Sequence, residues 1–351
     1  MPLNLTGNAR AIDAVARSLA SDNPPHAYLF TGPGRTGKAA VALRLAQALN
    51  CENTVGAGHS SSSRPPGALA VAPCLECHPC ARIESGLHAD VQTLTIELND
   101  DGEPKTAIAV DQVREVERAI ALNPYEGRTR VVIIDPADLL TDEAQNAFLK
   151  TLEEPPPHVV LVLIATREER LLPTVHSRCR RVQFRSVPTA EIEAALTGEG
   201  IEPDRAALLA RLARGRPGWA FGMARDPAAF ERRQSVLEAA RSVASMPLHQ
   251  RIALAEKLAA DYRSGRETMY ANLAEWAAWW RDVMLVQSGA EEGIANADML
   301  DGLRADARRY TRADVIAFVK ATTAAVEHLR AGVQPRPALE LLLLEAPFTA
   351  P

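Results

Sequence analysis

Continuous apolar runs rich in β-branched residues lie in the first half of the chain. Arg130–Ile134 and Val159–Ala165 are two such runs, and Ala27–Thr31 is a shorter one. A further strand is expected over Val91–Glu97. Runs of this kind are typical of strands that are buried on both faces, as in a parallel sheet.

Segments with helical periodicity alternate with these strands. Apolar residues recur at four-residue spacing over Lys38–Asn50, which predicts an amphipathic helix, and a second helix is expected around Asp111–Ala121. Thr141 is a suitable N-cap for a third helix, which Pro155–Pro157 should end. The alternation predicts an α/β fold with a right-handed, doubly wound parallel sheet.

The second half of the chain has no strand pattern beyond Val187. Short helices are expected over 188–225, with a break at Gly215–Gly218, and long Ala- and Leu-rich helices follow from about residue 227 to 345. We therefore expect three parts, namely an α/β domain over 1–186, a small helical part over 187–226 and an all-α domain over 227–351.

The composition is that of an ordinary globular protein, because 47% of the 351 residues are hydrophobic and 24% are charged. A net charge of −5 argues against an autonomous, strongly basic DNA-binding protein, and 5% aromatic residues leave few side chains to stack on single-stranded nucleic acid. No apolar run reaches the length of a membrane span, and the N-terminal sequence has no signal pattern. We expect a cytoplasmic protein without a membrane partner.

Four of the five cysteines crowd together, and two residues separate each of the last three: Cys51, Cys74, Cys77 and Cys80. A Gly-, Ser- and Pro-rich segment over 54–73, which we interpret as a flexible insertion, divides the first from the rest. Four thiolates suit tetrahedral Zn²⁺, which predicts a structural zinc module over 51–80. An iron–sulfur cluster would need another cysteine beyond Cys80, and a redox pair is the remaining alternative. Cys179 stands apart and is expected to be a small packing residue.

The segment between the first strand and the first helix fits the pattern GxxxxGK of a phosphate-binding loop. Backbone N–H groups of such a loop can hold phosphate oxygens, and the lysine reaches the β and γ phosphates. An Asp and a Thr end two later strands, where they could approach the metal and the γ-phosphate. The candidate nucleotide-binding residues are Gly32, Gly34, Gly37, Lys38, Asp135 and Thr166. Each candidate has a structural alternative: the loop could be a Gly-rich turn that binds nothing, Asp135 could only form a turn, and Thr166 could only end a strand.

Two positions of this site depart from those of nucleotide hydrolases. Ala39 stands where the motif has Ser or Thr, whose hydroxyl normally coordinates Mg²⁺. Pro136 follows Asp135 where hydrolases have a Glu that activates water. We therefore expect the isolated chain to lack useful ATPase activity, while binding of ATP or ADP is left open.

Basic residues gather over Arg167–Arg185, a segment with a local net charge of +4. The segment is either a solvated surface turn or a cluster that faces phosphates, those of DNA or of a neighbour's nucleotide. Further along the chain, Trp276, Trp279 and Trp280 share one face of a predicted helix. Such a stripe is typical of core packing or of an oligomer contact.

Several segments of the chain resemble the AAA+ clamp-loader family, and their combination is similar to its delta-prime members in bacterial DNA polymerase III. The resemblance covers nearly the whole chain and is most specific in the first half. It rests on the four clustered cysteines and on the segments His26–Lys38, Ala109–Glu115, Asn146–Pro156, Leu163–Glu168 and His176–Cys179.

The resemblance implies an AAA+ P-loop domain with a parallel sheet and a zinc insertion, followed by a helical lid and an all-α collar domain. The collar would join a hetero-pentameric ring with gamma/tau-type and delta-type subunits, and the ring would load the sliding clamp on primer-template DNA. The resemblance also makes Thr166 the sensor-1 residue and Arg178 an arginine finger that acts in trans on the ATP of a neighbouring subunit.

The departures from the family pattern favour the non-hydrolysing delta-prime type over the motor type. The gamma and tau subunits keep a P-loop Ser or Thr, a Glu after the strand-end Asp and an Arg in the lid. This chain has Ala39, Pro136 and Gly218 at those positions. Two alternatives stay open, an active gamma/tau-like clamp-loader ATPase and a zinc-stabilised scaffold without a nucleotide role.

Overall fold

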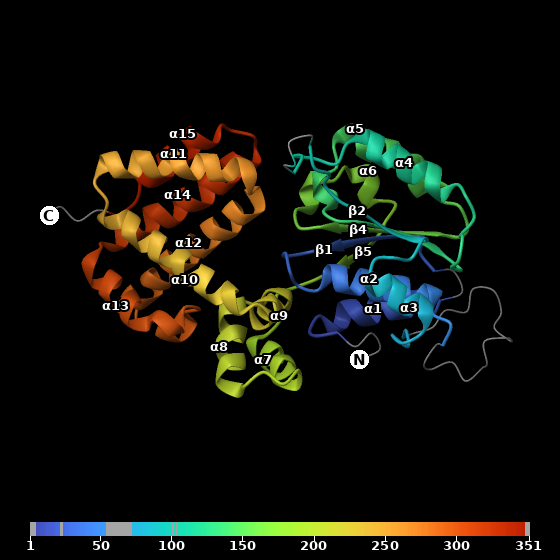
Figure 1. Cartoon of the computed structure of the whole chain (residues 1–351), viewed down its shortest axis with the longest axis horizontal. Helices are drawn as coiled ribbons and strands as arrows, with labels where there is room; N and C mark the ends of the chain where they lie inside the picture. Colours follow the sequence, from blue (N-terminus) through green and yellow to red (C-terminus); the bar gives the residue numbers. More distant parts are fainter. Residues whose placement is uncertain (1–4, 22–23, 54–71, 100–101, 103, 348–351) are drawn as a thin grey trace. The chain divides into compact units, whose positions relative to one another are not determined.

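The computed structural model describes residues 5–21, 24–53, 72–99, 102 and 104–347 (Figure 1). The chain divides into two compact units, 1–99 with 105–195 and 215–219, and 100–104 with 196–214 and 220–351. The insertion expected over 54–73 lies outside the described residues, apart from its last two. Among the helices that are described, none is both long and apolar enough to span a bilayer.

A five-stranded parallel sheet forms the centre of the first unit. Its strands lie in the order β2 (Val91–Leu94), β3 (Arg130–Ile134), β4 (Val159–Ala165), β1 (Ala27–Thr31) and β5 (Arg180–Gln183). β1 is fully buried and pairs along its whole length with β4, from Ala27 opposite Leu161 to Thr31 opposite Ala165. The parallel sheet expected from the apolar runs is confirmed.

β5 is an edge strand that the sequence pattern did not reveal. Within it only Val182 is buried, and Arg180 and Arg181 are exposed. Charged side chains on an edge strand discourage pairing with other chains. A strand with a single buried residue has no apolar periodicity, so the basic segment Arg167–Arg185 carries no strand signal.

Helices cover both faces of this sheet (Figure 1). One face carries α1 (Ala9–Leu19), α2 (Lys38–Asn50) and α3 (His78–Glu84), and the other carries α4 (Val110–Ile120), α5 (Asp142–Glu153) and α6 (Pro173–His176). Alternate residues of β1, β3 and β4 enter the two apolar cores, as Ile133 and Val132 of β3 do. Thr141 caps α5 as predicted, since its hydroxyl accepts the N–H of Ala144 at 3.2 Å.

Helices continue to the end of the described chain. They are α7 (Thr189–Gly198), α8 (Pro203–Ala213), α9 (Pro217–Arg225), α10 (Pro227–Ser242), α11 (Leu248–Ser264), α12 (Arg266–Gln287), α13 (Leu300–Arg309), α14 (Arg312–Arg330) and α15 (Pro335–Leu344). Trp276, Trp279 and Trp280 of α12 are at most 3% exposed, and the indole N–H of Trp279 donates to the carboxylate of Asp306 at 3.0 Å. The tryptophan stripe is therefore part of the core of the helical unit.

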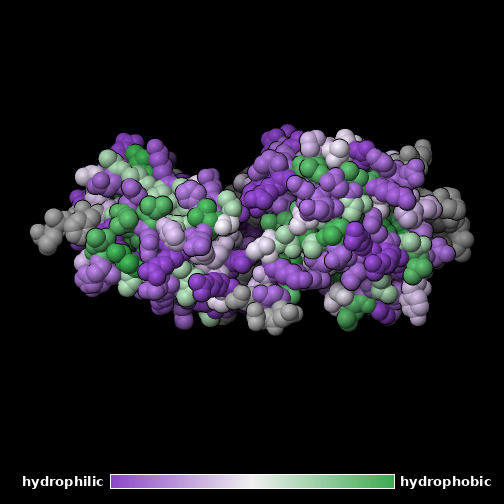
Figure 2. Space-filling view, turned by 90° about the horizontal axis from the view of Figure 1, so that it is seen from above, coloured by the Kyte–Doolittle hydropathy of each residue, from purple (hydrophilic) through white to green (hydrophobic). Residues whose placement is uncertain are grey.

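α11 and α15 run antiparallel and expose a group of aliphatic side chains. Arg336 pairs with Glu256 at 3.2 Å, and Arg251 donates to the carbonyl oxygen of Ala346 at 2.8 Å, so the start of α11 lies beside the end of α15. The group, called the α11/α15 surface below, consists of residues that are 42% to 60% exposed: Leu248, Ile252, Leu341 and Leu344. Figure 2 looks onto this side of the helical unit, where green apolar surface lies among purple polar surface.

Candidate nucleotide and metal sites

The phosphate-binding motif forms a tight turn between β1 and α2. Gly32 has a φ of +129°, and a Cβ there would lie 2.2 Å from the carbonyl oxygen of Phe184. Gly37 has a φ of +100° directly before α2. Both positions require glycine. A Cβ at Gly34 would meet nothing within 4 Å, so its glycine leaves open space beside the loop.

Lys38 is folded back against this loop. Its side chain is buried, and Nζ donates to the carbonyl oxygens of Gly32 at 2.5 Å and Pro33 at 2.7 Å. Burial lowers the pKa of Lys38, while the carboxylates of Asp135 and Asp138 act in the opposite direction. Two of the three ammonium donors of the lysine are therefore satisfied by the loop itself, where a phosphate would compete with two carbonyl oxygens.

Asp135 follows β3 directly and faces Lys38. Its backbone N–H donates to the carbonyl oxygen of Leu94 at 3.0 Å, which continues the β2–β3 ladder by one residue. Burial raises the pKa of Asp135, and the charge of Lys38 lowers it. The structure thus brings Asp135 within electrostatic reach of Lys38 in the Gly32–Lys38 loop.

Asp138 is a further residue of this region, which no sequence motif indicates. It is buried in a short 3₁₀ turn, and its carboxylate accepts the backbone N–H of Thr166 at 3.1 Å and the Nε–H of Arg167 at 3.3 Å. Thr166 itself is exposed just beyond the end of β4. A second Asp three residues after the strand-end Asp135 is the signal that could have indicated this link between the two strand ends.

The positions that depart from the hydrolase pattern lie around the same loop. Ala39 is exposed in the first turn of α2 and has no hydroxyl to offer. Pro136 has no carboxylate beside Asp135. The backbone N–H of Gly218 donates to the carbonyl oxygen of Arg35 at 3.0 Å, so the segment over 215–219 touches the loop through a residue without a side chain.

Arg178 lies near the amino end of β5, whereas this loop follows the carboxyl end of the neighbouring strand β1. One residue separates it from β5, and Arg180 at the start of β5 pairs with Tyr28, near the start of β1. Thr31, which precedes the loop, is three residues further along β1, or about 10 Å at the usual rise of a strand. The structure therefore separates Arg178 from Lys38 and Asp135 within the chain.

The four clustered cysteines converge on one point, as predicted. Their sulfur atoms lie within 4.8 Å of one another, and Sγ of Cys77 is 3.9 Å from Sγ of Cys51. Four Zn–S bonds of about 2.3 Å in a tetrahedron place the sulfurs about 3.8 Å apart, so the cluster fits such an ion. The backbone N–H of Cys77 donates to Sγ of Cys74 at 3.3 Å, which favours thiolate. The cluster could therefore hold a metal such as zinc, while Cys179 packs beside another core.

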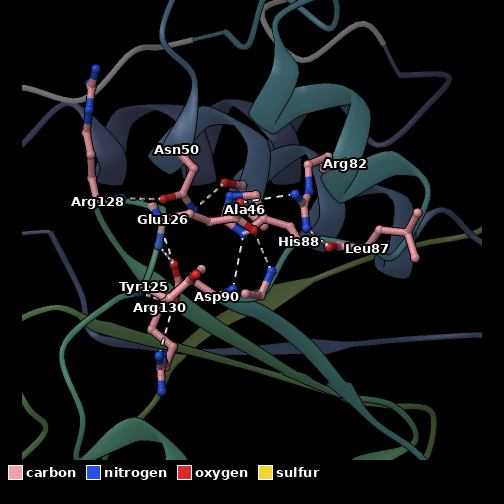
Figure 3. Close-up of polar contacts among 12 residues, drawn as sticks. Ala46, Asn50, Arg82, Leu87, His88, Asp90, Tyr125, Glu126, Arg128 and Arg130 are labelled. Carbon is pink, nitrogen blue, oxygen red and sulfur yellow. Dashed lines mark hydrogen bonds and ion pairs between the residues drawn. The ribbon is translucent and has the colours of Figure 1, made fainter.

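Figure 3 shows a polar network around the buried Asp90, which the sequence did not reveal; it includes Asn50, the residue before Cys51, and Arg82, two residues after Cys80. The carboxylate of Asp90 accepts the N–H groups of Tyr125, Glu126 and Gly127 at 2.7 to 2.8 Å and pairs with Arg130 at 2.9 Å. Burial raises the pKa of Asp90, but these donors together lower it to about 2.

The same network reaches the helices that carry the cysteines (Figure 3). Asn50, the last residue of α2, accepts the N–H groups of Arg128 and Thr129 through Oδ1 at 2.9 and 3.1 Å. Arg82 of α3 pairs with Glu126 at 3.3 Å. The loop before β3 is thus tied to both sides of the cluster.

Comparison with known proteins places the chain in a family. The sequence model described as "DNA polymerase III, delta subunit" matches residues 7–188. The chain is 28% identical over 339 residues to DNA polymerase III subunit delta' of Bacillus subtilis, which covers 95% of this chain and 94% of that protein. It is 33% identical over 218 residues to DNA polymerase III subunit tau of Escherichia coli, covering 60% of this chain and 30% of that protein.

Among solved structures, a DNA polymerase III gamma subunit-related protein of Thermotoga maritima aligns with 96% of this chain and 98% of its own length, at 18% identity and a TM-score of 0.45. The family match alone spans more than half of the chain. The protein therefore belongs to the AAA+ clamp-loader family of DNA polymerase III, whose members act in DNA replication.

Proposed function

We propose that the chain is a delta-prime-type subunit of the DNA polymerase III clamp loader, with a degenerate ATP site of its own. The similarity to a delta' sequence extends over 95% of the chain and 94% of that protein, whereas a gamma/tau sequence that matches 90% of the chain does so over 56% of its own length. Ala39 and Pro136 support the assignment, because the site then lacks the hydroxyl that holds Mg²⁺ and the carboxylate that activates water. ATP or ADP bound at Gly32–Lys38 would be retained rather than hydrolysed.

The observation that carries this proposal is the position of Arg178. The residue lies near the amino end of β5, while Lys38 lies beyond the carboxyl end of the neighbouring β1, so we expect the guanidinium of Arg178 to serve no nucleotide bound by the same chain. In a ring of AAA+ subunits each nucleotide lies at a boundary between subunits. The permanent charge and planar fork of arginine suit a γ-phosphate there, which supports Arg178 as a finger in trans.

We further propose that the chain works as a member of a hetero-pentameric ring with gamma/tau-type and delta-type subunits. Its parts would be an AAA+ domain over 1–186, a lid over 187–226 and a collar over 227–351. Through the ring it would help to load the sliding clamp on primer-template DNA. The α11/α15 surface supports an assembly role of the collar, because its aliphatic side chains are exposed while the tryptophans of α12 are internal.

For the cysteine cluster we propose structural zinc. Four sulfur ligands leave no open coordination position for a substrate, as in closed zinc sites. Zinc there would hold the end of α2 and the start of α3 together, because Cys51 follows α2 and Cys77 precedes α3.

An active gamma/tau-like ATPase is the second candidate, and the intact Gly32–Lys38 loop favours it. ATP turnover by the purified chain, with and without primed DNA, separates the two candidates. Turnover at the rate of a motor subunit that Lys38→Ala abolishes would support the second. Absent turnover, together with one stoichiometric ring formed with gamma/tau-type and delta-type subunits in native mass spectrometry, would support the first.

A further inference from the structure

The guanidinium of Arg178 is held from two sides. Nη1 donates to the carbonyl oxygen of Thr174 at 2.8 Å and to the hydroxyl of Ser177 at 3.2 Å. Nη2 forms an ion pair with the carboxylate of Glu153. Nε is buried and has no hydrogen-bond partner among the residues that the structure describes. These contacts define the plane of the guanidinium as well as its position.

The partners of Arg178 come from two different elements. Thr174 and Ser177 lie in and directly after α6, only a few residues before Arg178. Glu153 is the last residue of α5, a twelve-residue helix that packs on the sheet through Phe148 and Leu152. The local turn therefore holds one side of the guanidinium, and Glu153 ties the other side to the rigid body of the domain.

We propose that Glu153 is the positioning residue of Arg178, a role that rests on the proposed function of Arg178 as a finger in trans. An arginine side chain has many rotamers, and fixing it against a phosphate costs conformational entropy. Glu153 orients the fork within the subunit itself, so less freedom is lost when the fork meets the γ-phosphate. Nη1 donates both of its N–H groups to Thr174 and Ser177, while Nη2 keeps one N–H beyond the pair with Glu153 for a phosphate oxygen.

The exposure of the pair limits the size of the effect. The side chains of Arg178 and Glu153 are 30% and 50% exposed. Ion pairs at such exposure contribute little free energy. Loss of Glu153 should therefore change the rate of ATP hydrolysis only about two- to fivefold. Glu154, the next residue, is exposed, has the same charge and is not among the partners of Arg178 described above. It offers a matched control for the loss of one negative charge near the subunit boundary.

The test uses the ring reconstituted with gamma/tau-type and delta-type subunits, with ATP turnover stimulated by primed DNA and sliding clamp. Glu153→Ala should lower kcat about two- to fivefold at an unchanged KM for ATP. Glu153→Gln keeps an acceptor for Nη2 and should lose less, and Glu154→Ala should leave kcat unchanged. In a ring that carries Arg178→Ala, Glu153→Ala should have no further effect, because the two side chains act as one unit.

The outcomes distinguish this inference from the proposal on which it rests. If Arg178→Ala leaves turnover unchanged, the finger in trans is wrong and the role of Glu153 is wrong with it. If Arg178→Ala lowers turnover but Glu153→Ala does not, or raises it, only the positioning role is wrong. If Glu153→Ala lowers turnover by the same factor in the presence and in the absence of Arg178, the positioning role is also wrong, because Glu153 would then act on the fold and not on the finger.

Discussion

The ammonium group of Lys38 donates a hydrogen bond to the carbonyl oxygen of Gly32 at 2.5 Å, within the loop that would hold a phosphate. Burial lowers the pKa of this lysine, so the environment of the side chain opposes its charge. A phosphate at the loop must replace the bonds to Gly32 and Pro33 and keep the lysine charged. The geometry predicts weak nucleotide binding by the isolated chain, with no hydrolysis.

Restoring the missing hydroxyl should separate binding from hydrolysis. Ala39→Thr returns a ligand for Mg²⁺ next to Lys38, so nucleotide affinity should rise about tenfold in the presence of Mg²⁺ and little in its absence. Hydrolysis should stay absent because Pro136 supplies no base. Titration with a fluorescent ADP analogue, with Mg²⁺ or EDTA, measures the change. Ala40→Thr, exposed in the same turn, is the control, and an equal gain there would contradict the assignment.

The cysteine cluster should bind about one zinc per chain. Cys80→Ser removes a buried ligand, so it should lose the metal and increase hydrogen exchange over 72–90. Cys179→Ser changes a thiol outside the cluster and should keep both metal and protection. Metal analysis with hydrogen exchange checks this prediction. A metal-free chain that keeps the protection of α3 would contradict a structural role of zinc.

Asp90 should make the first unit sensitive to acid. Its pKa is lowered to about 2 from an ordinary 3.8, so its carboxylate stabilises the fold fully above about pH 4, and this contribution is lost as pH falls towards 2. Asp90→Asn should lower the free energy of unfolding by roughly 2 kcal/mol at pH 7. The gap, which is the difference in free energy of unfolding between the variant and the unmodified chain, should narrow below pH 4. Urea unfolding between pH 7 and pH 3 measures the gap. Asp111→Asn, a change at an 83% exposed side chain, should have little effect at any pH.

Arg178→Ala should leave folding, zinc content and ring assembly intact while it lowers ATP turnover by the assembled ring. Arginine fingers contribute about 10³- to 10⁵-fold in systems with a single site, and a ring with other working sites should lose less. Arg178→Lys should restore little, because a point charge lacks the planar fork. Arg181→Ala, at an exposed residue of β5, is the control. A ring that loads clamps at the unmodified rate with Arg178→Ala would exclude a finger role.

The α11/α15 surface should matter for assembly and not for folding. Replacing Leu341 and Leu344 together with Ser removes exposed aliphatic side chains, which should weaken ring formation about tenfold or more at unchanged thermal stability. Native mass spectrometry over a range of concentrations measures the loss. Val333→Ser, at 43% exposure before α15, is the control. Unchanged assembly of the double variant would exclude this surface from the subunit contact.

The amino-acid sequence by itself determined the elements whose signal is local. The runs that became β1, β3 and β4 were recognisable because strands buried on both faces consist of apolar residues. The turn of Gly32–Lys38 follows from glycines at positions of positive φ, and the spacing of Cys74, Cys77 and Cys80 already implied a shared ligand.

The tertiary structure decided what depends on partners far apart along the chain. Asp90 is held by a loop 35 to 37 residues later, and Asp138 meets Thr166 across 28 residues, so no local pattern indicates either contact. Arg178 was visible as a basic residue, but its separation from Lys38 follows from the register of β5 beside β1. β5 is not recognisable from the sequence because only one of its side chains is buried. Which residues of an edge strand are buried depends on its place in the sheet and not on the segment alone.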